Sequence, residues 1–306
     1  MKFVFSKKIK KDKSEGRPVL ALESTIIAHG MPYPENYNFA KKAEAECRKG
    51  GVSPATIAVL GGEIHVGLDD KNLKTVCRSK QILKVSKREL PFVIAKRQSG
   101  ATTVSATALI AFKAGIRVFA TGGIGGVHRG FEKNFDVSQD LKALSETRII
   151  VVSSGAKSIL DIPKTVESLE TFGVPVVGYN TSVFPSFYTR SSGVNIYHKA
   201  KTAKEIASIF FEHLKVGLSS SLLIVNPVPK KDQIEKDKLK TFISNSLVSA
   251  KKQKVSGKDL TPFLLKSILK QTNGKSLRTN ISLALNNIKL GAKIAKEVSL
   301  QDKIKM

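Results

Sequence analysis

Between residues 18 and 226, short apolar runs alternate with segments whose apolar residues recur at helical spacing. This alternation predicts an α/β fold with a three-layer α/β/α body and a largely parallel or mixed central sheet. Some runs are continuously apolar, such as Ile149–Val152, which is typical of central strands covered on both faces. Strands are expected at 19–23, 56–60, 82–85, 117–121, 149–153, 174–179 and 222–226.

The segments between these runs predict helices, several of which end at glycine. They are expected at 35–49, 105–114, 138–146, 164–172 and 202–215. After Pro229 the pattern becomes mainly helical, with segments near 232–253, 260–271 and 279–298. We therefore expect a single domain over 18–306, mainly helical over 228–306, preceded by a basic mobile tail over 1–17.

The formal net charge of +26 raises the question of nucleic-acid binding. The lysines gather at the two ends of the chain, and no aromatic residues are interleaved with them. This distribution favours a solvated basic surface, and a nucleic-acid-binding protein without catalysis remains the alternative. A basic chain also favours phosphorylated small molecules through its overall field.

The remaining composition points to a soluble protein of a reducing compartment. No apolar run approaches the roughly 20 residues that cross a bilayer, so no membrane association is expected. The basic start lacks the apolar core of a secretory signal, which favours the cytoplasm, with organellar targeting by the basic N-terminus as the alternative. Cys47 and Cys77 form no metal or redox pattern and are expected to be buried thiols in helices.

Candidate chemistry lies where predicted strands end, the edge at which open α/β sheets bind ligands. Glu23 ends the first of these strands, where burial should raise the pKa of its carboxyl and suit it to proton transfer. A local cap or salt bridge is an equal alternative. The small, hydroxyl-rich run 100–105 precedes a helix and could present backbone N–H groups to a phosphate.

A glycine-rich run over 122–126 allows close approach of the backbone to a ligand, and His128 next to it offers a donor to a substrate. Asp136, Ser138 and Asp140 follow, a pattern that could hold a hard divalent cation together with waters. The local sequence alone favours helix capping by these residues.

Lys157 follows the apolar strand 149–153 in the segment Gly155–Asp161. Ser158 and Asp161 resemble a capping box, so a helix is expected to begin near Ser158. Lys157 would then lie at the positive end of a helix dipole, where dipole and desolvation both favour the neutral amine. A neutral amine is the form that attacks a carbonyl to make a Schiff base.

Taken together, these segments resemble the pseudouridine-5′-phosphate glycosidase family, also called the indigoidine-synthase-A-like family. The resemblance covers the chain from Pro18 to about Val298. It rests on the strings ALESTIIAHGMPYPEN, PATIAVLGGEIHVGL, KVSKRELP, ATGGIGGVHRG, GAKSILD, LETFGVP and TPFLL.

This resemblance implies reversible cleavage of the C–C glycosidic bond of pseudouridine 5′-phosphate to uracil and ribose 5-phosphate. It makes Lys157 the nucleophile that forms an imine at C1′, Glu23 the proton donor and Asp136 the ligand of a divalent metal, usually manganese. The substrate contacts that it implies are Lys84, Val104, Ser138, Gln139, Asp140 and, near the uracil, Asn280. Family members usually have a small residue in place of Gln139, and they form homotrimers. Another imine-forming sugar-phosphate lyase on the same fold is the alternative.

Overall fold

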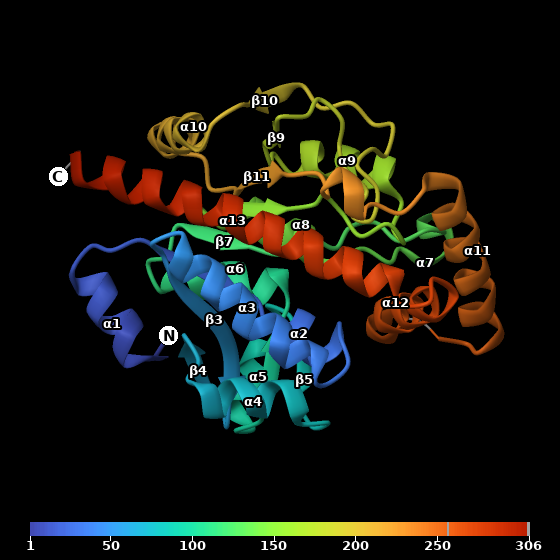
Figure 1. The fold of residues 1–306 in the computed structure, drawn as a ribbon, viewed down its shortest axis with the longest axis horizontal. Helices are drawn as coiled ribbons and strands as arrows, with labels where there is room; N and C mark the ends of the chain where they lie inside the picture. Colours follow the sequence, from blue (N-terminus) through green and yellow to red (C-terminus); the bar gives the residue numbers. More distant parts are fainter. Residues whose placement is uncertain (256, 305–306) are drawn as a thin grey trace.

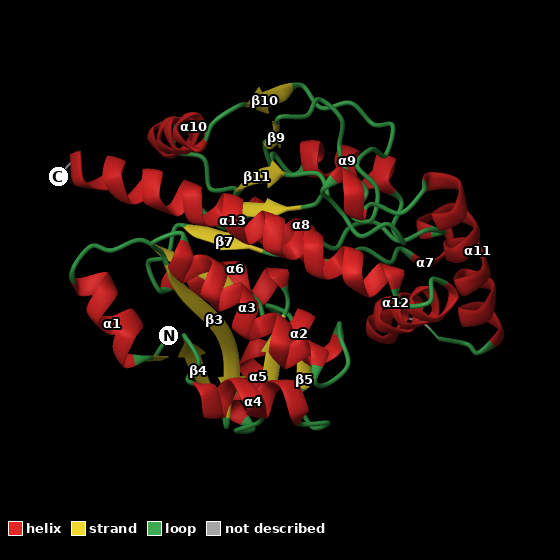
Figure 2. Cartoon of the chain, in the orientation of Figure 1, coloured by secondary structure: helices red, strands yellow, loops and turns green. Residues whose placement is uncertain are grey.

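The computed structural model describes residues 1–255 and 257–304, and it contains the expected mixed sheet flanked by helices (Figures 1 and 2). Every strand expected from an apolar run is present. These strands are β2 (Val19–Leu22), β3 (Ser53–Leu60), β5 (Leu83–Val85), β7 (Val118–Ala120), β8 (Ile150–Ser153), β9 (Val176–Tyr179) and β11 (Leu222–Val225).

The sheet also contains strands that the apolar pattern does not reveal. They are β1 (Phe3–Phe5), β4 (Glu63–Val66), β6 (Gly100–Thr102) and β10 (His198–Ala200). The order is β1-β4-β3-β2-β7-β8-β11-β9-β10, with β6 and then β5 branching from β3. β3 pairs antiparallel with β4 and β6, and all other pairs are parallel, so the sheet is mixed as expected.

Helices cover both faces of the sheet, which gives the three layers. In Figure 1, α13 (Lys275–Ile304) crosses in front of β7 and β8, beside α3 (Glu35–Lys49) and α10 (Ala203–Lys215). α6 (Val104–Lys113) and α8 (Gln139–Ser145) pack together behind the sheet, followed in the chain by α9 (Ile162–Thr171). The shorter helices are α2 (Thr25–His29), α4 (Asp70–Arg78), α5 (Leu90–Ala95) and α7 (Phe131–Asn134).

The N-terminal segment 1–17 is not a mobile tail, so this expectation was wrong. β1 pairs in parallel with β4, and α1 (Lys7–Ser14) packs on β3. Ile9 and Asp12 share the buried face of α1, and Asp12 accepts hydrogen bonds from Ser53 and from Arg17. Burial raises the pKa of the Asp12 carboxyl, but hydrogen bonds with Ser53 and Arg17 outweigh it and hold the pKa at about 2.

The C-terminal part is helical and packs on the α/β body, as expected. α11 (Lys236–Lys252) and α12 (Leu260–Gln271) pack against each other at one end of the molecule, and α13 returns along the sheet (Figure 1). Cys47 and Cys77 lie buried in α3 and α4, and burial raises the pKa of each thiol to about 12. None of the described helices is both long and apolar enough to span a membrane.

Candidate active site

Two cavities meet at the carboxyl ends of the central strands. The larger is a cleft of about 600 Å³ and the smaller an inner pocket of about 60 Å³. Five residues line both cavities, and they come from separate elements: Glu23, Thr25, Lys84, Lys157 and Thr261. The position agrees with the general rule that open α/β sheets bind ligands beyond the carboxyl ends of their strands.

Lys157 lies in an irregular loop, not at the start of a helix. α9 begins at Ile162, and its N-cap is Asp161, whose side chain accepts from the N–H of Lys164. The expected effect of a helix dipole on Lys157 is therefore wrong. The loop is held instead by a backbone bridge, in which the Lys157 N–H donates to the Ile124 carbonyl at 3.1 Å.

Gly155 shapes this loop just before the lysine. Its φ of +74° lies in the left-handed region, and a Cβ there would come within 2.1 Å of the Pro185 carbonyl oxygen. Lys157 itself is half-buried among fully buried neighbours, and its side chain reaches both cavities. The backbone thus fixes the lysine at the junction of the cleft and the inner pocket.

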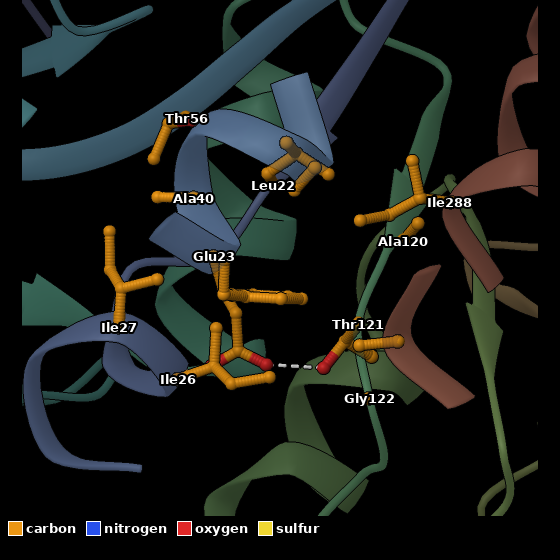
Figure 3. Close-up of a pocket in the computed structure, with 13 residues that line it drawn as sticks. Leu22, Glu23, Ile26, Ile27, Ala40, Thr56, Ala120, Thr121, Gly122 and Ile288 are labelled. Atoms are coloured by element: carbon orange, nitrogen blue, oxygen red, sulfur yellow. Dashed lines mark hydrogen bonds between the residues drawn. The ribbon is translucent and has the colours of Figure 1, made fainter. Parts of the chain in front are cut away.

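Glu23 follows β2 and faces Lys157 across that junction. Figure 3 shows its carboxylate accepting a hydrogen bond from the Thr121 hydroxyl, with the side chains of Leu22, Ile26 and Ile27 nearby. These apolar side chains help to line a chamber of about 20 Å³ behind the carboxylate. Desolvation raises the pKa of Glu23, while the charge of Lys157 and the Thr121 hydrogen bond oppose the rise. The pKa of Glu23 is thus raised, as the sequence predicted.

Lys84 and Asn280 complete the polar wall of the inner pocket. Lys84 is half-buried on β5, and desolvation and the neighbouring Lys157 lower its pKa. Asn280, on α13, is only 5% exposed, and its Oδ1 has no hydrogen-bond partner among the described residues. A buried acceptor without a partner costs free energy, which makes this atom a candidate acceptor for a donor group of a ligand.

The remaining residues predicted for substrate binding line the larger cleft. They are Val104, His128, Ser138, Gln139 and Asp140, together with Asp136. Val104 opens α6 and Ser138 caps α8. Desolvation lowers the pKa of the buried His128, against the opposing effect of Asp136, whose Oδ2 is 3.9 Å from Nδ1 of His128.

Asp140 connects two of the predicted ligand-binding segments. Its Oδ1 accepts from the N–H of Ser105 at 2.9 Å, and its Oδ2 accepts from the N–H of Gly125 at 2.8 Å. The carboxylate therefore takes up backbone donors of both the 100–105 run and the glycine run. The run 100–105 was predicted to offer such donors to a phosphate, but the N–H of Ser105 is used inside the protein.

The cation pattern of Asp136, Ser138 and Asp140 is not assembled as one cluster. Ser138 caps α8 by accepting from the Asp140 N–H at 3.2 Å, as the capping alternative predicts. Within the described residues no group of three His, Cys, Asp or Glu side chains is placed to hold a metal. The half-buried Asp136 at the cleft wall fits a site with one protein carboxylate, as hard divalent ions accept when water and substrate supply the other ligands.

Gln139 links α8 to the loop after β5. Its Oε1 accepts from the Ser86 hydroxyl at 2.8 Å and from the Arg88 N–H at 3.0 Å. The longer side chain thus binds protein atoms at the rim of the cleft. The departure from the small residue of the family's pattern has a structural role here.

The sequence analysis missed Asn287, which is fully buried on α13. Its amide nitrogen donates to the carbonyls of Thr121 and Gly122 at 2.8 and 3.2 Å, and its Oδ1 accepts from Asn226 at 3.1 Å. One side chain thus ties α13 to the loops that follow β7 and β11. Local sequence gave no clear signal for it, because the neighbouring Asn286 and Lys289 are also polar.

Comparison with known proteins places the chain among related sequences and structures. The family described as "Indigoidine synthase A like protein" matches residues 8–297. Pseudouridine-5′-phosphate glycosidase of Petrotoga mobilis is 50% identical over 286 residues, which cover 94% of each chain. The protein of the same name from Geobacillus kaustophilus is 49% identical and covers 97% of this chain and 98% of its own.

Two solved structures show a similar fold. The crystal structure of an indigoidine synthase A (IdgA)-like protein from Thermotoga maritima has a TM-score of 0.88 at 38% identity, covering 93% of this chain and 94% of that one. The prealnumycin C-glycosynthase AlnA in complex with ribulose 5-phosphate has a TM-score of 0.91 at 33% identity, covering 99% and 98%.

Proposed function

The chain belongs to the indigoidine synthase A-like family, and we propose that it is a pseudouridine-5′-phosphate glycosidase. Relatives with about 50% identity over nearly the full length carry this name. The observation that carries the proposal is the meeting of Lys157 and Glu23, which line both the inner pocket and the cleft. An amine and a carboxyl of raised pKa are the two groups that cleavage of a C-glycoside requires.

A C-glycoside has no leaving oxygen to protonate, so a pair of carboxylates alone does not suffice. The Nζ of Lys157 bonds to C1′ of the ribose as the ring C1′–O4′ bond breaks, and a proton passes from this nitrogen to O4′, which becomes a hydroxyl. The nitrogen lone pair then forms the C1′=N bond while the C1′–C5 bond breaks, and C5 of the uracil takes a proton from Glu23. Water adds to the protonated imine and releases ribose 5-phosphate and the free amine of Lys157, and the proton that this hydrolysis frees returns to Glu23.

The two cavities suggest where the parts of the substrate bind. We assign the uracil to the inner pocket, because the unpartnered Oδ1 of Asn280 matches a ring N–H donor. We assign the ribose phosphate to the larger cleft, whose wall includes Lys84, Val104 and the run 138–140. Lys84 supplies a positive charge that attracts the phosphate.

We propose that Asp136 holds the divalent metal, manganese by resemblance, with water and substrate as its other ligands. When bound, such an ion polarises an oxygen of the substrate or orients a water near the base. His128, next to Asp136, is the side chain that then orients this carboxylate. We also propose a cytoplasmic homotrimer, which sedimentation should show as three chains of 33.2 kDa.

Release of uracil tests the activity directly. The folded protein, incubated with pseudouridine 5′-phosphate and Mn²⁺, should release free uracil, and absence of release would reject the proposed function. AlnA, named a C-glycosynthase, also raises the possibility that a C–C bond is formed, so uracil and ribose 5-phosphate should be tested in the reverse direction.

Borohydride trapping tests the role of the lysine. Reduction in the presence of ribose 5-phosphate should add the sugar to Lys157 and raise the protein mass accordingly. Lys157→Ala should abolish both trapping and uracil release, and Lys164→Ala, an exposed lysine of α9, is the matched control. Trapping at an unchanged level in Lys157→Ala would contradict the assignment.

A further inference from the structure

Phe187 lines the inner pocket, and neither the sequence analysis nor the proposed mechanism gives it a role. It lies in the loop between β9 and β10, and its side chain is buried at 2% exposure. Its φ of +54° lies in the left-handed region, which a bulky side chain rarely adopts. Strain of this kind persists only where the surroundings enforce it, and it gathers at binding sites.

Contacts on both sides of Phe187 enforce this conformation. Its N–H donates to the Ser154 carbonyl at 3.0 Å, in the loop that follows β8. Ser186 and Thr189 exchange two backbone hydrogen bonds across it, at 3.1 and 3.2 Å. The ring of Tyr188 packs edge to face against the Phe187 ring, with 4.7 Å between the ring centroids. The ring of Phe187 is therefore a fixed part of the pocket wall.

The ring faces the glycine run that follows β7. A Cβ on Gly123 would lie 2.5 Å from Cδ2 of Phe187, so the missing side chain at this position makes room for the ring. A Cβ on Gly122 would lie 3.4 Å from Cε2 of Phe187 and also 3.4 Å from Oδ1 of Asn280. The same edge of the aromatic ring therefore lies next to the buried acceptor.

The inner pocket thus combines an aromatic edge with an acceptor that has no partner among the described residues. Each ring N–H of uracil has a carbonyl beside it, and the base is planar with apolar faces. The edge of an aromatic ring carries partial positive charge, so a carbonyl oxygen fits beside it while the N–H meets Asn280. Ribose phosphate has hydroxyl and phosphate groups in place of such a surface.

We propose that Phe187 is a base-contacting residue, which holds uracil in the inner pocket with one ring N–H against Oδ1 of Asn280. This inference rests on the proposed function. Phe187 lines the inner pocket but not the larger cleft, to which we assign the ribose phosphate. Loss of the ring should therefore weaken binding of the base and spare binding of the sugar phosphate.

Product inhibition measures these two effects separately. The inhibition constants of uracil and of ribose 5-phosphate are obtained from the rate at which pseudouridine 5′-phosphate is consumed, with the wild-type protein and with Phe187→Leu. We expect the constant for uracil to rise roughly tenfold, the scale of a lost apolar contact in a binding pocket, and that for ribose 5-phosphate to change less than about twofold. The ratio of the two constants should rise accordingly.

Phe184→Leu is the matched control. Phe184 is fully buried in the same loop, packs against Gly155 and lines neither cavity. This variant loses the same side-chain volume but should keep the wild-type ratio of the two constants. A wild-type ratio in Phe187→Leu, or an equal rise of the ratio in Phe184→Leu, would overturn the inference.

An inhibition constant does not depend on how much of a variant is folded, so partial unfolding does not affect the comparison. If Phe187→Leu does not fold at all, Phe187→Met serves in its place, because it keeps most of the volume but replaces the fixed ring by a flexible chain. Its ratio should rise as well, and a wild-type ratio would again overturn the inference. Failure of the wild-type protein to consume pseudouridine 5′-phosphate would instead reject the proposed function itself.

Discussion

At the residue scale, the catalytic role that we propose for Glu23 goes with an environment that disfavours its charged form. Its carboxyl lies between the cleft and an apolar chamber, so desolvation raises its pKa above the ordinary value of 4.5 (Figure 3). A proton donor benefits from a raised pKa, because more of the acid form is present near neutral pH. The raised pKa of Glu23 also lowers the stability of the folded protein at neutral pH.

We expect Glu23→Gln to stop uracil release and to raise the melting temperature at neutral pH. A folded-state pKa above the unfolded value gives stability that is present below pH 4.5 and is lost as pH rises through the folded-state pKa. Glutamine does not titrate, so it avoids this loss. Melting curves at pH 4 and pH 7 should therefore show a gain at pH 7 only.

Glu170→Gln, an exposed change on α9, is the control for a simple change in surface charge. It should show no comparable dependence of the melting temperature on pH. A melting temperature of Glu23→Gln that stays at or below the wild-type value at pH 7 would contradict the raised pKa of this carboxyl.

At the element scale, α13 holds the loops that form the site. Asn287 reaches from the helix to the carbonyls of Thr121 and Gly122 and to Asn226. Thr121 in turn donates to Glu23. Through Asn287 and Thr121 the helix therefore helps to position the Glu23 carboxyl, which we propose as the proton donor.

We expect Asn287→Leu to destabilise the protein by about 2–4 kcal/mol, because several buried groups lose their hydrogen-bond partners. Urea unfolding measures this change. Uracil release by the remaining folded protein should also fall in kcat, since Thr121 loses its fixed position. Asn286→Leu, the neighbouring residue with a single bond to the Pro227 carbonyl, should cost less in both measurements. Equal costs for the two variants would contradict the role of Asn287.

Prediction from sequence succeeded for elements whose pattern is set by burial. The apolar strands 149–153 and 222–226 were found because a central strand is covered on both faces. β6 was missed because its residues, Gly100–Thr102, are small and read as a loop before α6. β1 and α1 were read as a tail because lysines dominate the segment, although Ile9 and Asp12 face inward.

The site was predictable in part, for a similar reason. The sequence singled out Glu23 and Lys157 because they follow strongly apolar strands, and the structure brings them together where these strands end at one edge of the sheet. The helix expected at Ser158 was wrong because the loop pairs with Ile124, a contact between segments that local sequence does not reveal. Asn287 depends on tertiary contacts of this kind, and no local pattern singled it out.

At the scale of the whole molecule, the net charge of +26 acts on a dianionic substrate. Some of the basic residues lie on the cleft wall and others lie far from it. Arg88 and Lys142 lie on the cleft wall, whereas the lysines of α1 lie at the far end of the molecule from α12 (Figure 1). Salt can distinguish the effect of the charges on the cleft wall from the effect of the lysines of α1. The Debye length is about 30 Å at 0.01 M salt and about 8 Å at 0.15 M, so added salt screens the distant lysines first.

We expect kcat/KM for pseudouridine 5′-phosphate to fall several-fold between about 0.01 and 0.15 M salt, with kcat nearly constant, since screening weakens capture of the phosphate. The double variant Arg88→Gln/Lys142→Gln should lower kcat/KM at both salt concentrations. The remote triple variant Lys7→Gln/Lys10→Gln/Lys11→Gln should lower it only at low salt, where the Debye length of about 30 Å lets distant charges contribute. A salt-independent kcat/KM would show that the charge has no part in substrate capture. An equal loss in both variants at 0.15 M would show that the cleft wall has no special part in it.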